Sequence, residues 1–342
     1  MKLSYFTYGL TIDSDLPLPG LLALEPPPLA SDLIVRLASV PPWAREVNRV
    51  EPVVRRVRPA PVQSRESFMV WEYSGGSFFQ LLYGDGTRFI IDGSATRVWG
   101  EPGPGLTHED LCVYLLGPIM GFIARRRGFT PLHASSVAIG GRGVAILGEA
   151  GAGKSTTAAA LALRGWPVLC EDVCILAETN IQPHVIPGYP RICLWPDSVS
   201  YLFSASDALP LIVRGWEKRF LPLDGSRQAR LAMSSCSLSS ILFLAPRTDD
   251  DRAPSIEPLS KRHAVLQLVQ NTYMNWLMDP QQRANEFDAI VKLVSQVDCF
   301  RLIPSSDPAR LGELATKIEA HVLDRNTFAR VQIAPEIASC DV

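Results

Sequence analysis

Short apolar runs separated by polar, glycine-containing stretches dominate the first third of the chain. Aromatic and branched residues fill residues 68–73, 77–82 and 88–91, and glycines lie in the stretches between them. Runs of this composition joined by glycine turns predict a meander of β-hairpins. We therefore predict a β-rich N-terminal domain over residues 1–105, ending in the proline- and glycine-rich linker 102–105.

The rest of the chain mixes helical and strand-like patterns. A helix is predicted over residues 109–127, where apolar residues recur at helical spacing. Further strands are predicted at 136–139 and 144–147 (a hairpin), 167–170, 239–244 and 299–302, and further helices at 156–163, 261–277, 280–296 and 308–323. Together these segments predict an α/β (α+β) domain over residues 106–325, followed by a C-terminal tail, 326–342, without periodicity.

Composition narrows the class of function. The chain of 342 residues has 33 Lys and Arg against 35 Asp and Glu, interspersed, which predicts neither a nucleic acid nor a membrane as partner. No apolar run approaches the roughly 18–20 residues that span a bilayer, and the N-terminus lacks an apolar signal region. The seven cysteines have no paired spacing, so we expect neither a disulfide framework nor a zinc site, and a reduced, cytoplasmic location.

Residues 148–155 fit the phosphate-loop pattern G-x-x-x-x-G-K-[ST] without a mismatch. A strand-like run, 143–147, precedes them and a helix rich in Ala and Leu follows, which argues against a glycine turn that binds nothing. Glycines let successive N–H groups point inward, and the helix start adds partial positive charge. We predict that Lys154 reaches the terminal phosphates and that Ser155 holds Mg²⁺. The other predicted nucleotide contacts in this loop are Gly148, Ala150, Gly151, Ala152, Gly153 and Thr156.

Two adjacent carboxylates, Glu171 and Asp172, follow the predicted strand 167–170. Ionised groups next to a core are costly unless they are paired or bind a metal. Because this strand follows directly from the helix that begins near Lys154, its end can lie beside the loop. Carboxylates there can hold magnesium or accept the proton of an attacking hydroxyl. The alternative is a solvated turn after the strand.

Three further sites carry candidate side chains. His133 precedes the predicted hairpin, although a lone histidine is more often structural. Arg191 is either a phosphate contact or an exposed loop arginine. Lys218 and Arg219, between aromatic residues, are either a solvated strand edge or contacts to a nucleotide or substrate phosphate.

Taken together, these motifs resemble the HPr kinase/phosphorylase family. The likeness is strongest to the shorter kinase-like relatives encoded near lasso-peptide and other modified-peptide pathways. The matching segments are Leu132-His133-Ala134-Ser135-Ser136, residues 148–156, 164–172, 187–191 and 194–196, and Lys218-Arg219. They cover roughly residues 105–325 in a consistent order.

The resemblance implies a protein-serine kinase that uses ATP and Mg²⁺, with a fold akin to phosphoenolpyruvate carboxykinase. It implies that His133 lies in the active site, and that the family's usual Asp-Asp pair is here Glu171 and Asp172. We assign Glu171 as the base, linked to His133, and Asp172 with Ser155 to magnesium, with the reverse assignment left open. The capping segment of the family's reverse, phosphorylase reaction has no match, so only the kinase reaction is expected.

The leading hypothesis is therefore a serine kinase acting on a peptide or small protein, first of all a lasso-type precursor peptide. Arg191, or Lys218 with Arg219, would neutralise charge in the transition state, and the N-terminal domain would present the acceptor. Alternatives are a kinase of a small-molecule hydroxyl or of HPr, and a nucleotide-binding regulator with little turnover, which Glu171 in place of aspartate keeps open. Because the family tends toward oligomers, a homo-oligomer is a further expectation.

Overall fold

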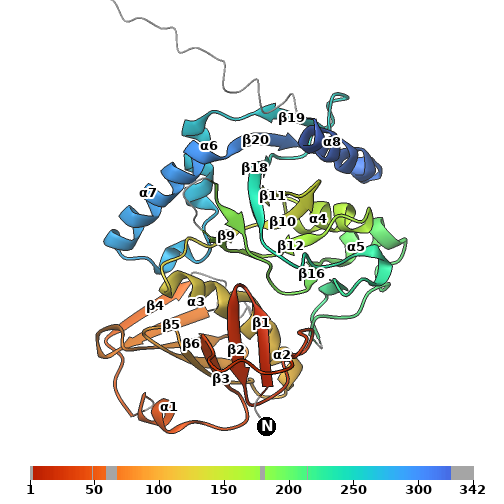
Figure 1. Ribbon diagram of the computed structural model, residues 1–342. Coiled ribbons are helices and arrows are strands. Elements are labelled where there is room, and N and C mark those ends of the chain that lie inside the picture. The colour runs from red at the N-terminus through yellow and green to blue at the C-terminus, as the bar shows by residue number, and fades with distance from the viewer. Residues whose placement is uncertain (1–2, 48, 59–67, 178–181, 214, 325–342) are drawn as a thin grey trace, which may run out of the picture.

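The computed structural model describes residues 3–47, 49–58, 68–177, 182–213 and 215–324, and Figure 1 shows their arrangement. Over these described residues the fold is mixed α/β, with two eight-stranded sheets and two smaller strand pairs. The predicted C-terminal tail lies outside the described residues. Within the described part of the chain, no helix is both long and apolar enough to cross a membrane.

The first sheet is built from the N-terminal third of the chain, in the order β1-β2-β3-β8-β7-β6-β5-β4. Its strands are β1 (Leu3–Thr7), β2 (Leu10–Ser14), β3 (Leu33–Arg36), β4 (Val54–Arg58), β5 (Phe68–Tyr73), β6 (Phe78–Tyr83), β7 (Arg88–Asp92) and β8 (Arg97–Glu101), with a short helix α1 (Pro42–Val47) after β3. Neighbours from β4 to β8 are antiparallel, which confirms the predicted meander. Strand β3 instead runs parallel to both β2 and β8.

A helical layer covers the first sheet and lies between the two sheets (Figure 1). It consists of α2 (His108–Tyr114), a π-helical turn (Leu115–Ile119) and α3 (Met120–Arg126), close to the predicted helix 109–127. The turn contains Pro118, whose ring clashes with a preceding carbonyl and which lacks an N–H, so the regular ladder widens there. Thus the first helices after residue 105 pack against the N-terminal sheet.

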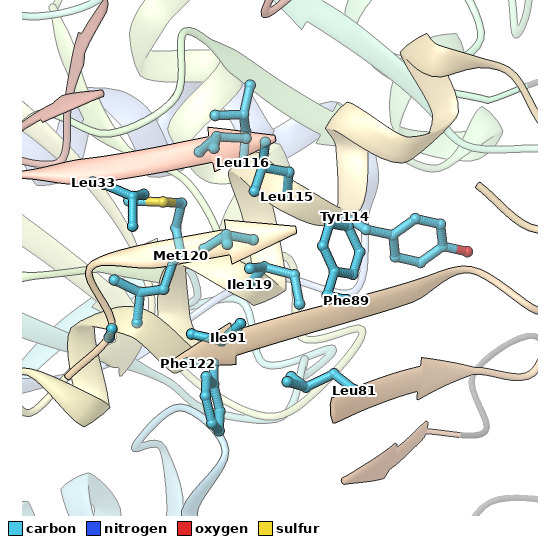
Figure 2. Close-up of a cluster of buried hydrophobic side chains, with 14 of the residues drawn as sticks. Leu33, Leu81, Phe89, Ile91, Tyr114, Leu115, Leu116, Ile119, Met120 and Phe122 are labelled. Carbon is cyan, nitrogen blue, oxygen red and sulfur yellow. The ribbon is translucent and has the colours of Figure 1, made fainter. Parts of the chain in front are cut away.

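Apolar side chains from these two layers form a shared core (Figure 2). Phe89 and Ile91 of β7 are fully buried against Ile119 and Met120 of the helical layer. At roughly 25 cal/mol per Å² of buried apolar surface, side chains of this size contribute about 2 kcal/mol each. The same core extends to Val173 of the second half of the chain, so the two halves share it.

The second sheet holds the predicted hairpin and has the order β12-β10-β11-β18-β15-β14, with β20 pairing with β18 and β19. Its strands are β10 (Ser135–Ile139), β11 (Arg142–Leu147), β12 (Val168–Cys170), β14 (Leu176–Ala177), β15 (His184–Val185), β18 (Cys236–Leu244), β19 (Ser255–Pro258) and β20 (Asp298–Ile303). The smaller pairs are β9 (Leu132–His133) with β13 (Val173–Cys174), and β16 (Arg191–Leu194) with β17 (Arg219–Pro222). Strands β11, β18 and β20 are parallel, so their carboxyl ends meet at one edge.

Helices cover both faces of this sheet. Val144 and Ile146 of β11 pack in the cluster that contains α4 (Lys154–Leu163) and α8 (Leu311–Leu323). Ala145 and Leu147, which point the other way, pack with α6 (Lys261–Gln270) and α7 (Pro280–Gln296). Helix α5 (Pro196–Phe203) follows β16 and adds Val199 to the first of these clusters. The alternation follows from the two-residue period of a strand.

One predicted helix is shorter in the structure. Helix α6 ends at Gln270, whereas the apolar pattern predicted a helix to residue 277. The Asn271 carbonyl accepts from the His133 N–H at 2.8 Å, and the Tyr273 N–H donates to the Pro131 carbonyl at 2.7 Å. These main-chain groups are engaged by the segment around β9, so they are not available to continue the helix.

The turn between β1 and β2 is docked on the second half of the chain. The Tyr8 N–H donates to the Pro187 carbonyl at 3.0 Å, and the Thr7 hydroxyl donates to the Gly188 carbonyl at 3.1 Å. The Tyr8 hydroxyl donates to the Leu116 carbonyl at 3.0 Å. A side chain on Gly188 would come within 2.7 Å of the Tyr8 ring, so a glycine is required there.

We predict that Glu286→Gln lowers the free energy of unfolding by about 3 kcal/mol, because the Arg125 charge would remain buried without its partner. Arg125 of α3 and Glu286 of α7 form an ion pair at 2.6 Å, with side chains only 9% and 6% exposed. Urea unfolding measures the loss. Glu313→Gln, which breaks the more exposed pair with Arg310, is the matched control and should cost less than about 1 kcal/mol. Equal losses would contradict the prediction.

Candidate active site

The loop between β11 and α4 has the backbone shape that its glycines allow. Gly148, Gly151 and Gly153 have φ angles of 151°, 79° and 110°, in the region that L side chains rarely adopt. A Cβ on Gly148 would also lie 3.0 Å from the Leu244 Cβ of β18. The predicted order of strand, loop and helix is therefore found, and α4 begins at Lys154.

Lys154 and Ser155 stand at the start of α4. The Lys154 ammonium donates to the carbonyls of Gly148 and Glu149, at 2.8 and 3.1 Å. Burial lowers its pKa, which the charges of the nearby carboxylates partly oppose. The Ser155 hydroxyl donates to Glu171 Oε1 at 2.8 Å. The loop and the carboxylate pair thus meet in space, as the strand order predicted.

The two carboxylates reach the loop because of the way β12 pairs. Strand β10 is antiparallel to both β11 and β12, so β11 and β12 end at the same edge of the sheet. Glu171 and Asp172 follow β12 directly. Asp172 has φ 66°, which is uncommon for a residue other than glycine and concentrates at functional sites.

His133 contacts Asp172, not Glu171, so the predicted pairing of His133 with Glu171 is wrong. His133 Nδ1 lies 3.0 Å from Asp172 Oδ1, and the Tyr273 hydroxyl donates to Asp172 Oδ2 at 3.1 Å. The reason is the register of the small β9–β13 pair, which sets His133 opposite Val173, the residue after Asp172.

The surroundings shift the two carboxyl pKa values in opposite directions. Burial and the neighbouring Asp172 charge raise the pKa of Glu171. Burial alone would also raise that of Asp172, but the hydrogen bond and charge of His133, with Lys218 and Tyr273, outweigh it and lower the pKa to about 2. Adjacent acids whose pKa values are shifted in opposite directions are typical of sites where the two acids have separate acid–base or metal-binding roles.

Among the predicted cations outside the loop, Lys218 acts on both carboxylates. Its charge lowers the pKa of both Glu171 and Asp172, and its ammonium lies 4.8 Å from the Trp195 ring centre. Arg191 stacks 4.5 Å above the Tyr189 ring, on the strand whose Cys193 N–H points to Glu171.

Arg219 is directed elsewhere. Its guanidinium donates to the Leu209 carbonyl at 2.5 Å, and the residue lines a neighbouring cavity whose wall also includes Trp195 and Trp216. The structure therefore brings His133, Lys154, Ser155, Glu171, Asp172 and Lys218 together and leaves Arg219 outside this group. Thr156, the last residue of the predicted loop contacts, pairs its hydroxyl with that of Ser198 at 2.7 Å.

The residues fit a magnesium site of the kind that substrate phosphates complete. In the described part of the chain, no cluster of three or more His, Cys, Asp or Glu side chains could hold a metal alone. Magnesium commonly takes one or two carboxylates together with phosphate oxygens and waters. The Ser155 hydroxyl and the Glu171 carboxylate supply such a partial set.

Two residues of this region, Tyr273 and Arg247, were not predicted from the sequence. Tyr273 lay in a segment predicted to be helical, so no local pattern marked it. Arg247 follows β18, and its guanidinium lies 3.6 Å from the position of a Cβ on Gly153. The rule that loops at the carboxyl ends of parallel strands gather around a ligand could have indicated it.

No protein-family model matches the chain, and no match is found among curated proteins. Among solved structures, one match is the Hpr(Ser) kinase/phosphatase from Coxiella burnetii, with 17% identity and a TM-score of 0.33. The match covers 57% of this chain and 98% of that chain. At this TM-score the likeness assigns neither a family nor an activity to the chain.

We predict that Glu171→Gln stabilises the metal-free protein at neutral pH and loses this advantage in acid. A pKa raised by folding means that the folded state binds the proton more tightly than the unfolded chain. The wild-type protein therefore loses stability as pH rises through that raised pKa, and the uncharged variant does not. Urea unfolding from pH 5 to pH 8 should show the gap widening with pH. Glu257→Gln, at an exposed position of β19, controls for removal of one negative charge, and a constant gap would contradict the prediction.

Proposed function

We propose that this chain is an ATP- and Mg²⁺-dependent kinase that transfers the γ-phosphoryl group to a serine hydroxyl of a peptide or small protein. The observation that carries the proposal is the 2.8 Å hydrogen bond from Ser155 to Glu171. It joins the start of α4 to the carboxylate pair, whose second member, Asp172, is held by His133 and Tyr273. Phosphoryl transfer requires this combination of phosphate cradle, metal ligands and an acceptor-orienting carboxylate.

The loop and Lys154 would hold the phosphates. Inward-pointing N–H groups and the start of α4 favour negative charge, and Lys154 would exchange its two loop carbonyls for phosphate oxygens. Magnesium, when bound, neutralises the charge that develops on the transferring group. We assign its protein ligands to Ser155 and Glu171, because these two side chains already share one hydrogen bond.

Asp172 would then orient the acceptor hydroxyl, which reverses the roles first assigned to the two acids. His133 and Tyr273 fix both oxygens of its carboxylate. A pKa of about 2 makes Asp172 a weak base, but phosphoryl transfer depends mainly on positioning and charge neutralisation. Lys218, whose charge lowers the pKa of both acids, would offset negative charge in the transition state, and so would Arg191, on the strand that carries Cys193.

The proposed acceptor class rests on the sequence resemblance to kinases of lasso-peptide pathways. A serine in a lasso-type precursor peptide is the first candidate, and HPr the second. The docked β1–β2 turn places the N-terminal sheet next to the carboxylates, which supports a role for that sheet in positioning an acceptor.

We expect intact-mass analysis to show the gain of one phosphate on an acceptor incubated with the protein, ATP and Mg²⁺. The acceptors are a serine-containing lasso-type precursor peptide, HPr and free serine. Lys154→Ala should abolish the gain by weakening nucleotide binding. Nucleotide binding without transfer to any of the three would overturn the kinase proposal in favour of a nucleotide-binding regulator.

Two variants separate the roles of the acids. Asp172→Asn should slow transfer by about a hundredfold or more while leaving Mg²⁺–nucleotide affinity nearly unchanged. Glu171→Gln should instead weaken the Mg²⁺ dependence of nucleotide binding, because it removes a charged ligand. The opposite pattern would restore the assignment of Glu171 as base and Asp172 as metal ligand.

A further inference from the structure

A cavity of about 290 Å³ lies beside the phosphate loop, on the face of the sheet covered by α4 and α8. Three loops line it, one from the carboxyl end of each of the parallel strands β11, β18 and β20. They contribute residues 151–153, Arg247 and residues 304–308. Ligands of open α/β sheets bind at this kind of edge, outside the carboxyl ends of the strands.

One wall of the cavity carries two exposed aromatic rings. Trp195 precedes α5 and is 51% exposed, and Tyr201 lies on that helix and is 58% exposed. Asp197 and Ser198 of the same helix also line the cavity. Large exposed aromatic side chains with polar groups beside them are typical of surfaces that stack a planar ligand.

Two charged side chains of this cavity, Asp197 and Arg247, are without a partner among the described residues. Among the described residues, neither the Asp197 carboxylate nor the Arg247 guanidinium makes a hydrogen bond or an ion pair. Arg247 lines the cavity next to Gly153 and also borders a larger cavity on the other side of the loop. A carboxylate beside aromatic rings can accept from the amino group of a base, and an arginine beside the loop can meet phosphate oxygens.

The orientation of the phosphate chain limits the nucleoside to the cavities beside the loop after β18, of which this is one. Its transfer end is set by Glu171 and Asp172, which approach the loop from β12. Strand β18 borders β11 on the opposite side, so the nucleoside leaves toward the loops after β18 and β20. Thr156 and Thr157, in the first turn of α4, line the cavity and give the chain a path to it.

A second, larger cavity of about 690 Å³ also borders the loop, on the face covered by α6. It is lined by His263, Gln267 and Arg301 and by the buried ring of Phe243. It contains neither Thr156 nor Thr157, and none of its lining residues is an exposed aromatic. The smaller cavity matches a nucleoside better, because only the base and sugar need to fit in it while the phosphates lie outside it. Pockets of about 300 Å³ are at the small end of ligand sites, which suits a part of a ligand of that size.

We propose that this cavity binds the base of a purine nucleoside triphosphate, with Trp195 and Tyr201 against the base, Asp197 on its amino group, and Arg247 at the phosphates nearest the nucleoside. The proposal rests on the proposed phosphate site and adds a base-recognition subsite to it. Adenine and guanine share the ring system and an amino group, so the experiment separates them.

The test compares the affinities of MgATP, MgGTP, MgUTP and magnesium tripolyphosphate for the full chain, measured by isothermal titration calorimetry. MgATP or MgGTP should bind about tenfold to a hundredfold more tightly than tripolyphosphate, which lacks a base. Tyr201→Ala and Trp195→Ala should remove most of this advantage. Tyr201→Ala should also leave tripolyphosphate affinity unchanged, whereas Trp195 contacts the Lys218 ammonium, so its variant is judged by the purine advantage alone. Trp195→Phe should retain part of it, because a stacking face remains.

Phe287→Ala removes an aromatic ring of similar exposure on α7, away from the cavity, and is the matched control. It should leave every affinity unchanged. Equal binding of purine nucleotides and tripolyphosphate, or Tyr201→Ala and Trp195→Ala variants that retain the purine advantage, would overturn the base subsite while the phosphate site stands. A retained advantage lost instead in Gln267→Ala would move the base to the larger cavity. Binding of neither ATP nor tripolyphosphate would overturn the proposed function itself.

Discussion

The candidate site depends on the direction of one strand. Because β10 runs antiparallel between β11 and β12, both neighbours end at the same edge of the sheet. That geometry brings the Ser155 hydroxyl within 2.8 Å of Glu171, although the two residues belong to different elements. With β12 in the opposite direction, the acids would lie at the far edge, and the glycine loop would face no carboxylate. The way the short apolar strands β10, β11 and β12 pair therefore decides whether a carboxylate lies beside the glycine loop.

The electrostatics of this edge follow from where each charge is held. Glu171 faces the loop and accepts hydrogen bonds from the Ser155 hydroxyl and the Cys193 N–H, but burial and the neighbouring Asp172 charge outweigh them and raise its pKa. Asp172 faces His133 and Tyr273, whose donated hydrogen bonds favour its charged form. Lys154 and Lys218 add positive charge around both. The two lysines thus offset the two carboxylates. An incoming polyphosphate with its magnesium would replace these charge–charge interactions rather than enter a pocket without charged groups.

Local patterns in the sequence predicted what local physics determines. The glycine loop, the hairpin before it and the helix after it were readable, because glycine φ requirements and apolar periodicity act over a few residues. The partner of His133 was not readable, since it depends on the register of a two-residue strand pair. Tyr273 was hidden for a similar reason. It follows a helix whose end is set by main-chain hydrogen bonds to a distant segment, and the sequence of residues 261–277 does not indicate where that helix ends.

The docking of Tyr8 has a consequence for how the protein is made. Tyr8 precedes the glycine loop in the chain, yet it packs on Gly188 and is buried beside Asp172. Tyr273, which completes the same carboxylate's hydrogen bonds, is synthesised much later. Contacts this far apart in sequence form slowly and only after the intervening segments have been made. A chain whose glycine loop has already been made therefore still lacks the complete surroundings of Asp172, which form only once the segment that contains Tyr273 has been made and has folded against it.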